Sequence, residues 1–217
     1  MNNLNLTQTE KNNPQSGLKK QPKMIIVIEG PSGVGKDTTI QALINRYPDR
    51  FAKLTSVATR AMRPGESQGH PYHFVDNATF DQMVQSGDVF EFTIRHGEKR
   101  GMSEKYIHAI FDQNKIPLKD CDLVGVKALR SRFDHVLTIF LTADKDMIAH
   151  RLQKRGDDPA EIAKRLADYD NYMTNAQYYD NVVDSTDLDK SIDKILQIID
   201  NYSYIKGEKN GKKSITK

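Results

Sequence analysis

One run of the sequence, residues 30–36, has the composition of a loop that binds phosphate. It reads Gly-Pro-Ser-Gly-Val-Gly-Lys, follows an apolar stretch at 24–28 and precedes a segment of helical period. Glycines let successive backbone N–H groups point inward as an anion nest, and the amino end of the next helix adds about half a positive charge. The spacing predicts that the β and γ phosphates of a nucleotide contact Lys36. The rest of the predicted cradle is Gly30, Pro31, Ser32, Gly33, Val34 and Gly35.

The loop departs from the common phosphate-binding pattern at its last position. The pattern G-x-x-x-x-G-K-[ST] ends on a hydroxyl residue that helps to hold Mg²⁺, whereas Asp37 follows the lysine here. A carboxylate also ligates a hard cation through oxygen, and Thr38 is the next hydroxyl. We therefore expect ATP as the phosphoryl donor and Mg²⁺ as a cofactor, with Asp37 and Thr38 beside the metal.

The elements around this loop alternate between short apolar runs and longer segments of helical period, which is typical of βαβ units around a parallel sheet. Strands are expected near 24–29, 136–141 and 182–183, and helices near 38–47, 144–154, from 158 onward and 188–199. The stretch 56–100 breaks the alternation, with strands expected at 72–75 and 89–94 around a short helix at 78–85. Insertions at the carboxyl edge of such sheets commonly build the site for a second substrate. We therefore predict an α/β fold, a P-loop NTPase-type parallel sheet flanked by helices, with an inserted acceptor-binding subdomain and a helical lid.

Composition excludes several other classes of protein. The 217 residues include one cysteine, Cys121, so no internal disulfide forms and a cytoplasmic location is expected. The longest apolar run is far below the roughly 20 residues that span a bilayer, so we expect no membrane segment. Residues 1–23 and 201–217 are polar and lysine-rich, and we expect a disordered tail and a basic flexible tail. No aromatic residues alternate with those lysines as stacking would require, so no nucleic-acid partner is expected, and the choice between monomer and homodimer stays open.

Several separated blocks, taken in order, resemble the guanylate kinase family. They are GPSGVGKDTT at 30–39, SVATRAMRPGESQGHPYHFV at 56–75, FEF at 90–92, DCDLVG at 120–125 and RLQKRG at 151–156. The second block is the specific one, because many families share a phosphate-binding loop. The resemblance covers about residues 24–200 and implies a GMP-binding insertion at about 56–102 and a lid at about 151–168. It implies a nucleoside monophosphate kinase of purine nucleotide metabolism that transfers phosphate from ATP to GMP or dGMP.

By this resemblance, residues of the insertion bind the acceptor nucleotide. Guanidinium forks suit a monophosphate dianion, and the family's phosphate-gripping positions are Arg60, Arg63 and Tyr72. The base-reading positions are Glu91 and Asp122, with Ser56 as a third contact. Guanine's Watson–Crick edge presents N–H donors, so carboxylates are suitable acceptors there, although each acid alone would also serve as a helix cap.

The same resemblance assigns the groups that neutralise the transferred phosphate. Charge on the equatorial oxygens needs cations more than a strong base, and Lys36 acts with three expected lid residues, Arg151, Arg155 and Arg165. An exposed, salt-bridged helix would show the same arginine spacing. Two carboxylates complete the set: we expect Glu66 to orient the acceptor loop and Asp120 to contact the metal or an arginine.

The match to the family fails at three places. The family's Tyr-Gly-Ser/Thr element is Arg100-Gly101-Met102 here, so Arg100 is expected to hold phosphate, whereas Met102 offers no donor to guanine, a loss of about 1 to 3 kcal/mol. Pro117 and Lys119 are unfavourable in a central strand. Ser185 stands where the family has an Asn near the adenine site. Two alternatives therefore stay open, a ribose 1,5-bisphosphate kinase-like sugar-phosphate kinase and a guanylate-kinase-like interaction module without activity.

Overall fold

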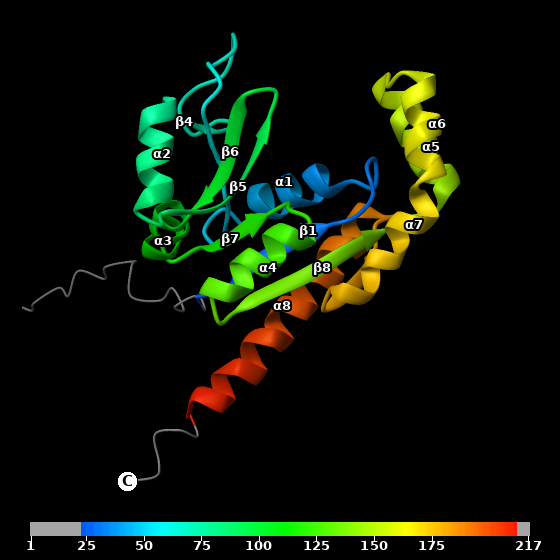
Figure 1. Ribbon diagram of the computed structural model, residues 1–217. Helices are drawn as coiled ribbons and strands as arrows, with labels where there is room; N and C mark the ends of the chain where they lie inside the picture. The colour runs from blue at the N-terminus through cyan, green and yellow to red at the C-terminus, as the bar shows by residue number, and fades with distance from the viewer. Residues whose placement is uncertain (1–22, 212–217) are drawn as a thin grey trace, which may run out of the picture.

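The computed structural model describes the backbone of residues 23–211 and the side chains of residues 23–203. The strands are β1 Ile25–Glu29, β2 Phe51–Lys53, β3 Val57–Ala58, β4 His73–Phe74, β5 Val89–Arg95, β6 Glu98–Ser103, β7 Ile116–Lys119, β8 Val136–Thr142 and β9 Asn181–Asp184. The helices are α1 Lys36–Arg46, α2 Asn77–Gln85, α3 Glu104–Asp112, α4 Leu123–Arg132, α5 Lys145–Arg155, α6 Pro159–Ala167, α7 Tyr169–Met173, the 3-10 helix η1 Thr174–Tyr178 and α8 Leu188–Gly211. Figure 1 shows their arrangement.

Five parallel strands form the central sheet, in the order β2-β7-β1-β8-β9. All five residues of β1 are buried, because this strand lies in the middle of the sheet and is covered on both faces. A strand buried in this way reads as a continuous apolar run, as residues 24–28 do. The predicted parallel sheet is therefore confirmed, with β1 leading directly into the glycine-rich loop.

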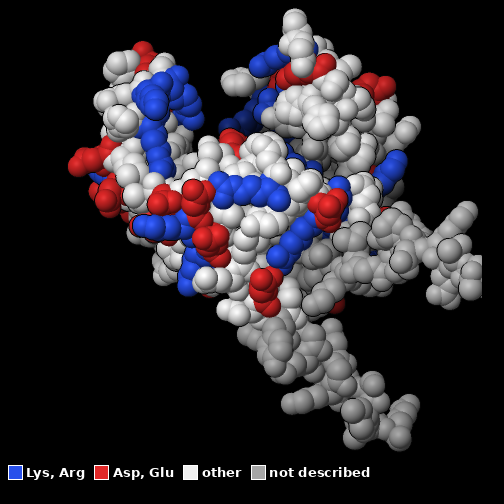
Figure 2. Space-filling model, turned by 180° about the vertical axis from the view of Figure 1, so that it is seen from behind, with Lys and Arg blue, Asp and Glu red and all other residues white. Residues whose placement is uncertain are grey.

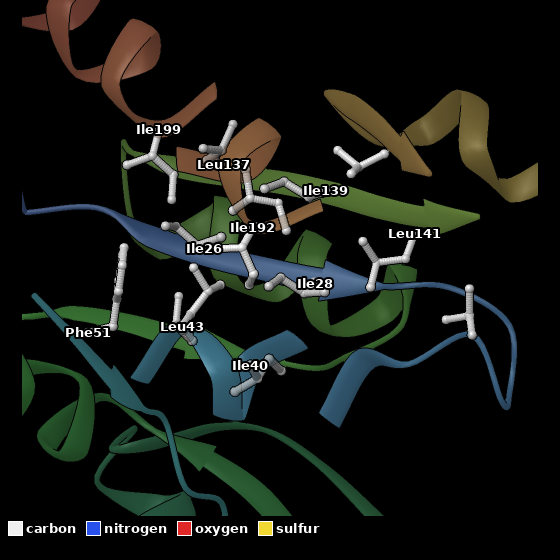
Figure 3. Close-up of a cluster of buried hydrophobic side chains, with 14 of the residues drawn as sticks. Ile26, Ile28, Ile40, Leu43, Phe51, Leu137, Ile139, Leu141, Ile192 and Ile199 are labelled. Carbon is white, nitrogen blue, oxygen red and sulfur yellow. The ribbon is translucent and has the colours of Figure 1, made fainter. Parts of the chain in front are cut away.

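Alternate residues of β1 face two different helical layers. Ile26 and Ile28 pack with residues of α1 and α8, and Figure 3 shows these side chains meeting Ile40, Leu43, Ile192 and Ile199. Ile25 and Val27 pack on the other face with residues of α3 and α4. Because both faces of the sheet are sealed, the loop at the carboxyl end of β1 is held on a rigid base.

The insertion forms a second sheet in the order β4-β3-β6-β5. The expected strands and helix are present, and β6 is an additional strand that pairs antiparallel with β5 and β3. Asp76 caps α2, since its side chain accepts a hydrogen bond from Thr79 N. In Figure 1 this sheet and the helices α5 and α6 rise at opposite ends of the central sheet.

Pro117 lies inside an interior strand without interrupting it. Ile116 N donates to Arg50 O and Leu118 O accepts from Leu54 N, so these two residues face the β2 side of β7. The residue between them faces β1, where pairing begins only at Ile26 with Leu118. The missing N–H of proline therefore falls just before the paired segment, which explains why the expected penalty does not prevent the strand.

Helix α8 continues past residue 200, where we expected a flexible tail to begin. Tyr202 packs against the core beside Ile199, and its ring lies 6.5 Å from that of His135. These contacts extend the amphipathic helix, which runs to Gly211. The tail expected at 1–23 lies outside the described residues except for Lys23. Within residues 23–211, no helix has the length and apolar character needed to cross a bilayer.

Candidate active site

The glycine-rich loop and the amino end of α1 form one wall of a cavity of about 410 Å³. Every residue of the predicted cradle except Gly30 lines it, together with Asp37 and Thr38. The opposite wall comes from α5 and from the turn after β9, through Arg151, Arg155, Ser185 and Leu188. This arrangement joins backbone donors, a lysine and two arginines around a space that suits the phosphates of a nucleotide.

Lys36 contacts the loop that precedes it and a carboxylate that the sequence did not single out. Its Nζ donates to the carbonyl oxygen of Gly30 and lies 4.0 Å from Glu29 Oε1. Glu29 is buried at the end of β1 and accepts a hydrogen bond from the hydroxyl of Tyr172. Burial raises the pKa of the Glu29 carboxyl, and the Lys36 charge acts in the opposite direction. The sequence held one indication of Glu29, because it is a charged residue directly after the apolar run 24–28.

The three predicted lid arginines have different partners. Arg151 donates to the Val34 carbonyl oxygen at 2.6 Å and to that of Ser185 at 2.8 Å, which ties α5 to the glycine-rich loop. The two others bind one carboxylate: Asp157 accepts from Arg155 Nε at 2.6 Å and from Arg165 Nη1 at 2.7 Å.

Arg165 also reaches the loop itself. Its Nη1 lies 3.1 Å from Ser32 Oγ, although α6 and the loop are more than 130 positions apart in sequence. The hydrogen bond from Arg155 is the largest cause of the lowered pKa of the Asp157 carboxyl, so Asp157 stays ionised between the two arginines. Arg151 and Arg165 thus contact the glycine-rich loop, whereas Arg155 is exposed and bound to Asp157, as in a salt-bridged helix.

A second cavity, of about 320 Å³, lies between the loop and the insertion. Its lining includes Ser56, Tyr72 and Arg100 from the insertion, and Asp37 from α1, which also lines the first cavity. Arg100 Nη1 lies 3.1 Å from the Tyr72 hydroxyl, and its guanidinium lies over the Tyr72 ring. Figure 2 shows the molecule hollowed between its two raised lobes, with Lys and Arg side chains on both sides of the hollow.

The acceptor loop is organised by Glu66. Both terminal nitrogens of Arg60 bind its carboxylate, at 2.7 and 2.5 Å, and the backbone N–H of Arg63 donates to the same group at 2.8 Å. The hydrogen bond from Arg60 is the main reason that the pKa of Glu66 falls to about 2. The Arg60 side chain is nearly buried, and its Nε has no hydrogen-bond partner in the described part of the chain. Arg63 is exposed.

The two predicted base-reading acids differ in what they contact. Glu91, on β5, is half-buried, and its pKa is raised by burial first and by the charge of Asp122 second. Asp122 is the amino-terminal cap of α4, because its Oδ1 accepts from Val124 N at 3.0 Å and Gly125 N at 3.1 Å. Capping through one oxygen leaves the other available to a ligand.

Met102 is the cross-strand neighbour of Glu91 and is only 2% exposed, packed with core residues such as Ile107. Lys119, which was expected to be unfavourable in the strand, lies beside Ser56, the predicted third base contact. Lys119 Nζ donates to Ser56 Oγ at 2.7 Å, and both residues line the second cavity. The two residues are 63 positions apart, so the sequence did not predict this contact. The only indication was that Lys119 directly precedes Asp120.

The carboxylates expected near a metal lie where the two cavities meet. Asp37 is largely exposed and lies 3.7 Å from Lys53 Nζ, while Asp120 lines the second cavity with it. Thr38 is exposed on the first cavity. Among the described residues, no group of three or more His, Cys, Asp and Glu side chains is arranged to hold a metal ion. Mg²⁺ at phosphoryl-transfer sites takes one or two carboxylates plus substrate phosphates, so this pair has the right chemistry for it.

Comparisons with known proteins point to one family. A family model described as guanylate kinase matches residues 22–202. The guanylate kinase of Chromohalobacter salexigens is 34% identical over 173 residues, which cover 79% of this chain and 80% of that protein. The guanylate kinase of Idiomarina loihiensis is 30% identical over 178 residues, covering 81% and 85%. In fold, the crystal structure of guanylate kinase from Anaplasma phagocytophilum matches with a TM-score of 0.57 at 24% identity, covering 82% of this chain and 85% of that one.

Proposed function

The chain belongs to the guanylate kinase family, and we propose that it transfers the γ-phosphoryl group of ATP to GMP or dGMP, giving ADP and GDP or dGDP. The observation that carries the proposal is the pair of cavities that share Asp37. One is lined by the phosphate-binding loop and lid arginines, and the other by hydroxyl and guanidinium groups suited to a monophosphate. Two phosphorylated substrates bound there would meet at the shared wall.

The donor side provides positive charge where the transition state is negative. In the transfer, the bond between the γ-phosphorus and the β,γ-bridging oxygen breaks, and a bond to a phosphate oxygen of GMP forms. Lys36, with the lid cations Arg155 and Arg165, neutralises the charge on the equatorial oxygens. Arg151 positions the lid through its bonds to three backbone carbonyls, those of Val34, Ser185 and Thr186. The backbone N–H groups of the loop hold the β phosphate.

We further propose that Asp37 and Asp120 hold Mg²⁺ directly or through water, with Thr38 as an additional oxygen. When bound, this ion would act as a Lewis acid and neutralise part of the charge on the phosphates. Lys53 near Asp37 limits the net negative charge of the pair.

On the acceptor side, we propose that Tyr72, Arg100, Arg63 and Arg60 hold the GMP phosphate. Glu66 acts indirectly, because it fixes Arg60 and the backbone at Arg63. The carboxylates of Glu91 and Asp122 accept from N1–H and the 2-amino group of guanine. Adenine has an acceptor at N1, which an ionised carboxylate repels.

The domain boundaries follow the same roles: an acceptor-binding insertion at about 56–102 and a lid at about 151–168. We place the enzyme in the cytoplasm, since its one cysteine forms no internal disulfide. Cys121 is half-buried, and burial raises the pKa of its thiol to about 12, so it is not a nucleophile of this reaction.

A coupled ADP-release assay tests the proposed function. The acceptors are GMP, dGMP, AMP, UMP and ribose 1,5-bisphosphate, each with ATP and Mg²⁺. We expect turnover with GMP and dGMP and at least 100-fold lower kcat/KM with the others. Turnover with ribose 1,5-bisphosphate alone would refute the nucleotide acceptor. Binding of guanine nucleotides without turnover would instead support an interaction module.

A further inference from the structure

The predicted base-reading residues include two carboxylates, Glu91 and Asp122, which interact electrostatically, but no side-chain donor at Met102, where the family has a Ser or Thr. Guanine presents N1–H and 2-amino donors together with the O6 and N7 acceptors. Glu91 and Asp122 answer the donors. Met102 is the cross-strand neighbour of Glu91, is buried in the core, and carries no N–H or O–H group. A guanine bound there needs a donor from another element.

Lys119 provides a donor at this place. It is the last residue of β7, so its backbone is fixed by the parallel sheet beside β1. Its ammonium lies 2.7 Å from Ser56 Oγ, and the two residues line the same cavity. An ammonium has three donors, so the bond to Ser56 leaves others for a ligand.

The charge of Lys119 also reaches Glu91. It lowers the pKa of the Glu91 carboxyl, against the larger effects of burial and of Asp122, which raise it. Glu91 therefore interacts with both an ammonium donor and a second carboxylate acceptor, so the site offers hydrogen-bond donors and acceptors together. That combination matches guanine, whereas adenine would direct its 6-amino group toward the ammonium.

We propose that Lys119, supported by Ser56, reads the O6 and N7 edge of guanine and so replaces the donor that is absent at Met102. The inference rests on the proposed function, since it names a specificity-determining residue of the same acceptor site. Lys119 donates to O6 or N7, and Ser56 orients the ammonium and supplies its own hydroxyl.

A plain counter-ion role for Lys119 makes a different prediction. A counter-ion would keep Glu91 and Asp122 ionised, and its loss would weaken binding of every guanine nucleotide by a similar factor. A reading role makes the effect depend on the atoms at positions 6 and 7 of the base. Two analogues separate these roles because both keep N1–H and the 2-amino group: 6-thio-GMP has a poor acceptor at position 6, and 7-deaza-GMP has none at position 7.

The experiment uses the full chain and measures KM in the ADP-release assay and Kd by calorimetry for GMP and both analogues. For native protein we expect at least one analogue to bind about 10- to 100-fold more weakly than GMP, the effect of losing one hydrogen bond to a charged group. Lys119→Met should weaken GMP binding by a similar factor and bring the ratio of the analogue Kd to the GMP Kd close to 1. Lys127→Met, an exposed lysine on α4, is the matched control and should leave every value within about twofold.

Each outcome decides one of the two claims. If native protein neither binds nor phosphorylates GMP, the proposed function fails and this inference with it. If native protein phosphorylates GMP but treats both analogues like GMP, the reading role alone is overturned, and this comparison needs no variant to fold. If Lys119→Met weakens GMP and both analogues equally, the lysine is only a counter-ion and the proposal is wrong.

Discussion

Gly33 offers the sharpest test of how the phosphate-binding loop is held in place. It has a φ of +88°, and a Cβ at this position would lie 2.9 Å from Leu152 Cγ and Cδ2 and 3.2 Å from Ile148 Cγ2. Leu152 is fully buried in the main core, so displacing its side chain would disturb its packed neighbours. Gly33→Ala therefore combines a left-handed backbone penalty of about 1 to 2 kcal/mol with an overpacking cost of about 1 to 3 kcal/mol.

The matched control is Gly156→Ala, at the carboxyl end of α5. Its φ is +85°, and a Cβ there would meet no atom within 4 Å, so only the backbone penalty applies. Urea unfolding followed by circular dichroism should show Gly33→Ala losing about 1 to 3 kcal/mol more than Gly156→Ala. A native stability of about 5 to 15 kcal/mol leaves both variants folded enough to measure.

A double-mutant cycle identifies the contact responsible. Leu152→Ala removes the two closest atoms that the new methyl group would touch and leaves the Ile148 contact, so in that background the extra cost of Gly33→Ala over Gly156→Ala should shrink markedly. The ATP KM should rise more for Gly33→Ala than for Gly156→Ala, because the displaced loop carries the phosphate donors. Equal stability losses for the two glycine variants, or no coupling to Leu152, would refute the reasoning that α5 sets the position of the loop.

Three further predictions concern charge at the site. Lys36→Met should lower kcat with GMP about 100-fold or more while the urea midpoint changes little; a near-normal rate would remove the lysine from the mechanism. Asp37→Asn should raise the Mg²⁺ concentration for half-maximal activity and weaken Mn²⁺·ATP binding by calorimetry, with Thr38→Val compared alongside; unchanged metal affinity would assign the ion to Asp120 and water. Glu66→Gln should raise the GMP KM and lower stability at pH 7, because Arg60 loses its charged partner. Since the pKa of Glu66 falls from 4.5 to about 2, that stability difference should be full above pH 4.5 and vanish as the pH falls through about 2; a difference that stays constant to pH 2 would contradict the role of this ion pair.

Local patterns in the sequence were sufficient for the sheet and the donor loop. Residues 24–28 are apolar because β1 is buried on both faces, and the helix begins at Lys36, inside the glycine-rich run. The insertion was predicted from the break in the alternation at 56–100. Glu66 was expected to orient the acceptor loop, and the structure shows it binding Arg60 and the backbone of Arg63.

The parts that could not be predicted depend on pairs of residues far apart in the chain. Lys119 was predicted to be unfavourable within a strand. Only the fold shows that its side chain contacts Ser56 at the wall of the second cavity. The bond between Glu29 and Tyr172 joins the start of the loop to the helix after the lid, 143 residues away. Pro117 is tolerated because of where β7 begins to pair with β1, and register between strands is not encoded in either strand alone.

The shared carboxylate of Asp157 makes two lid arginines a single unit. Arg155 and Arg165 bind the same side chain, and Arg165 also contacts Ser32 in the loop. If either arginine is removed, the other gains sole use of Asp157 and is drawn more strongly toward it, away from the phosphates. The kinetic effects of the two substitutions are therefore coupled. The fold-decrease in rate of the double variant should differ from the product of the two single fold-decreases. Removing Asp157 would release both guanidinium groups, so that each could bind the nucleotide phosphates. The lid would at the same time lose the contact that joins Arg155 to Arg165.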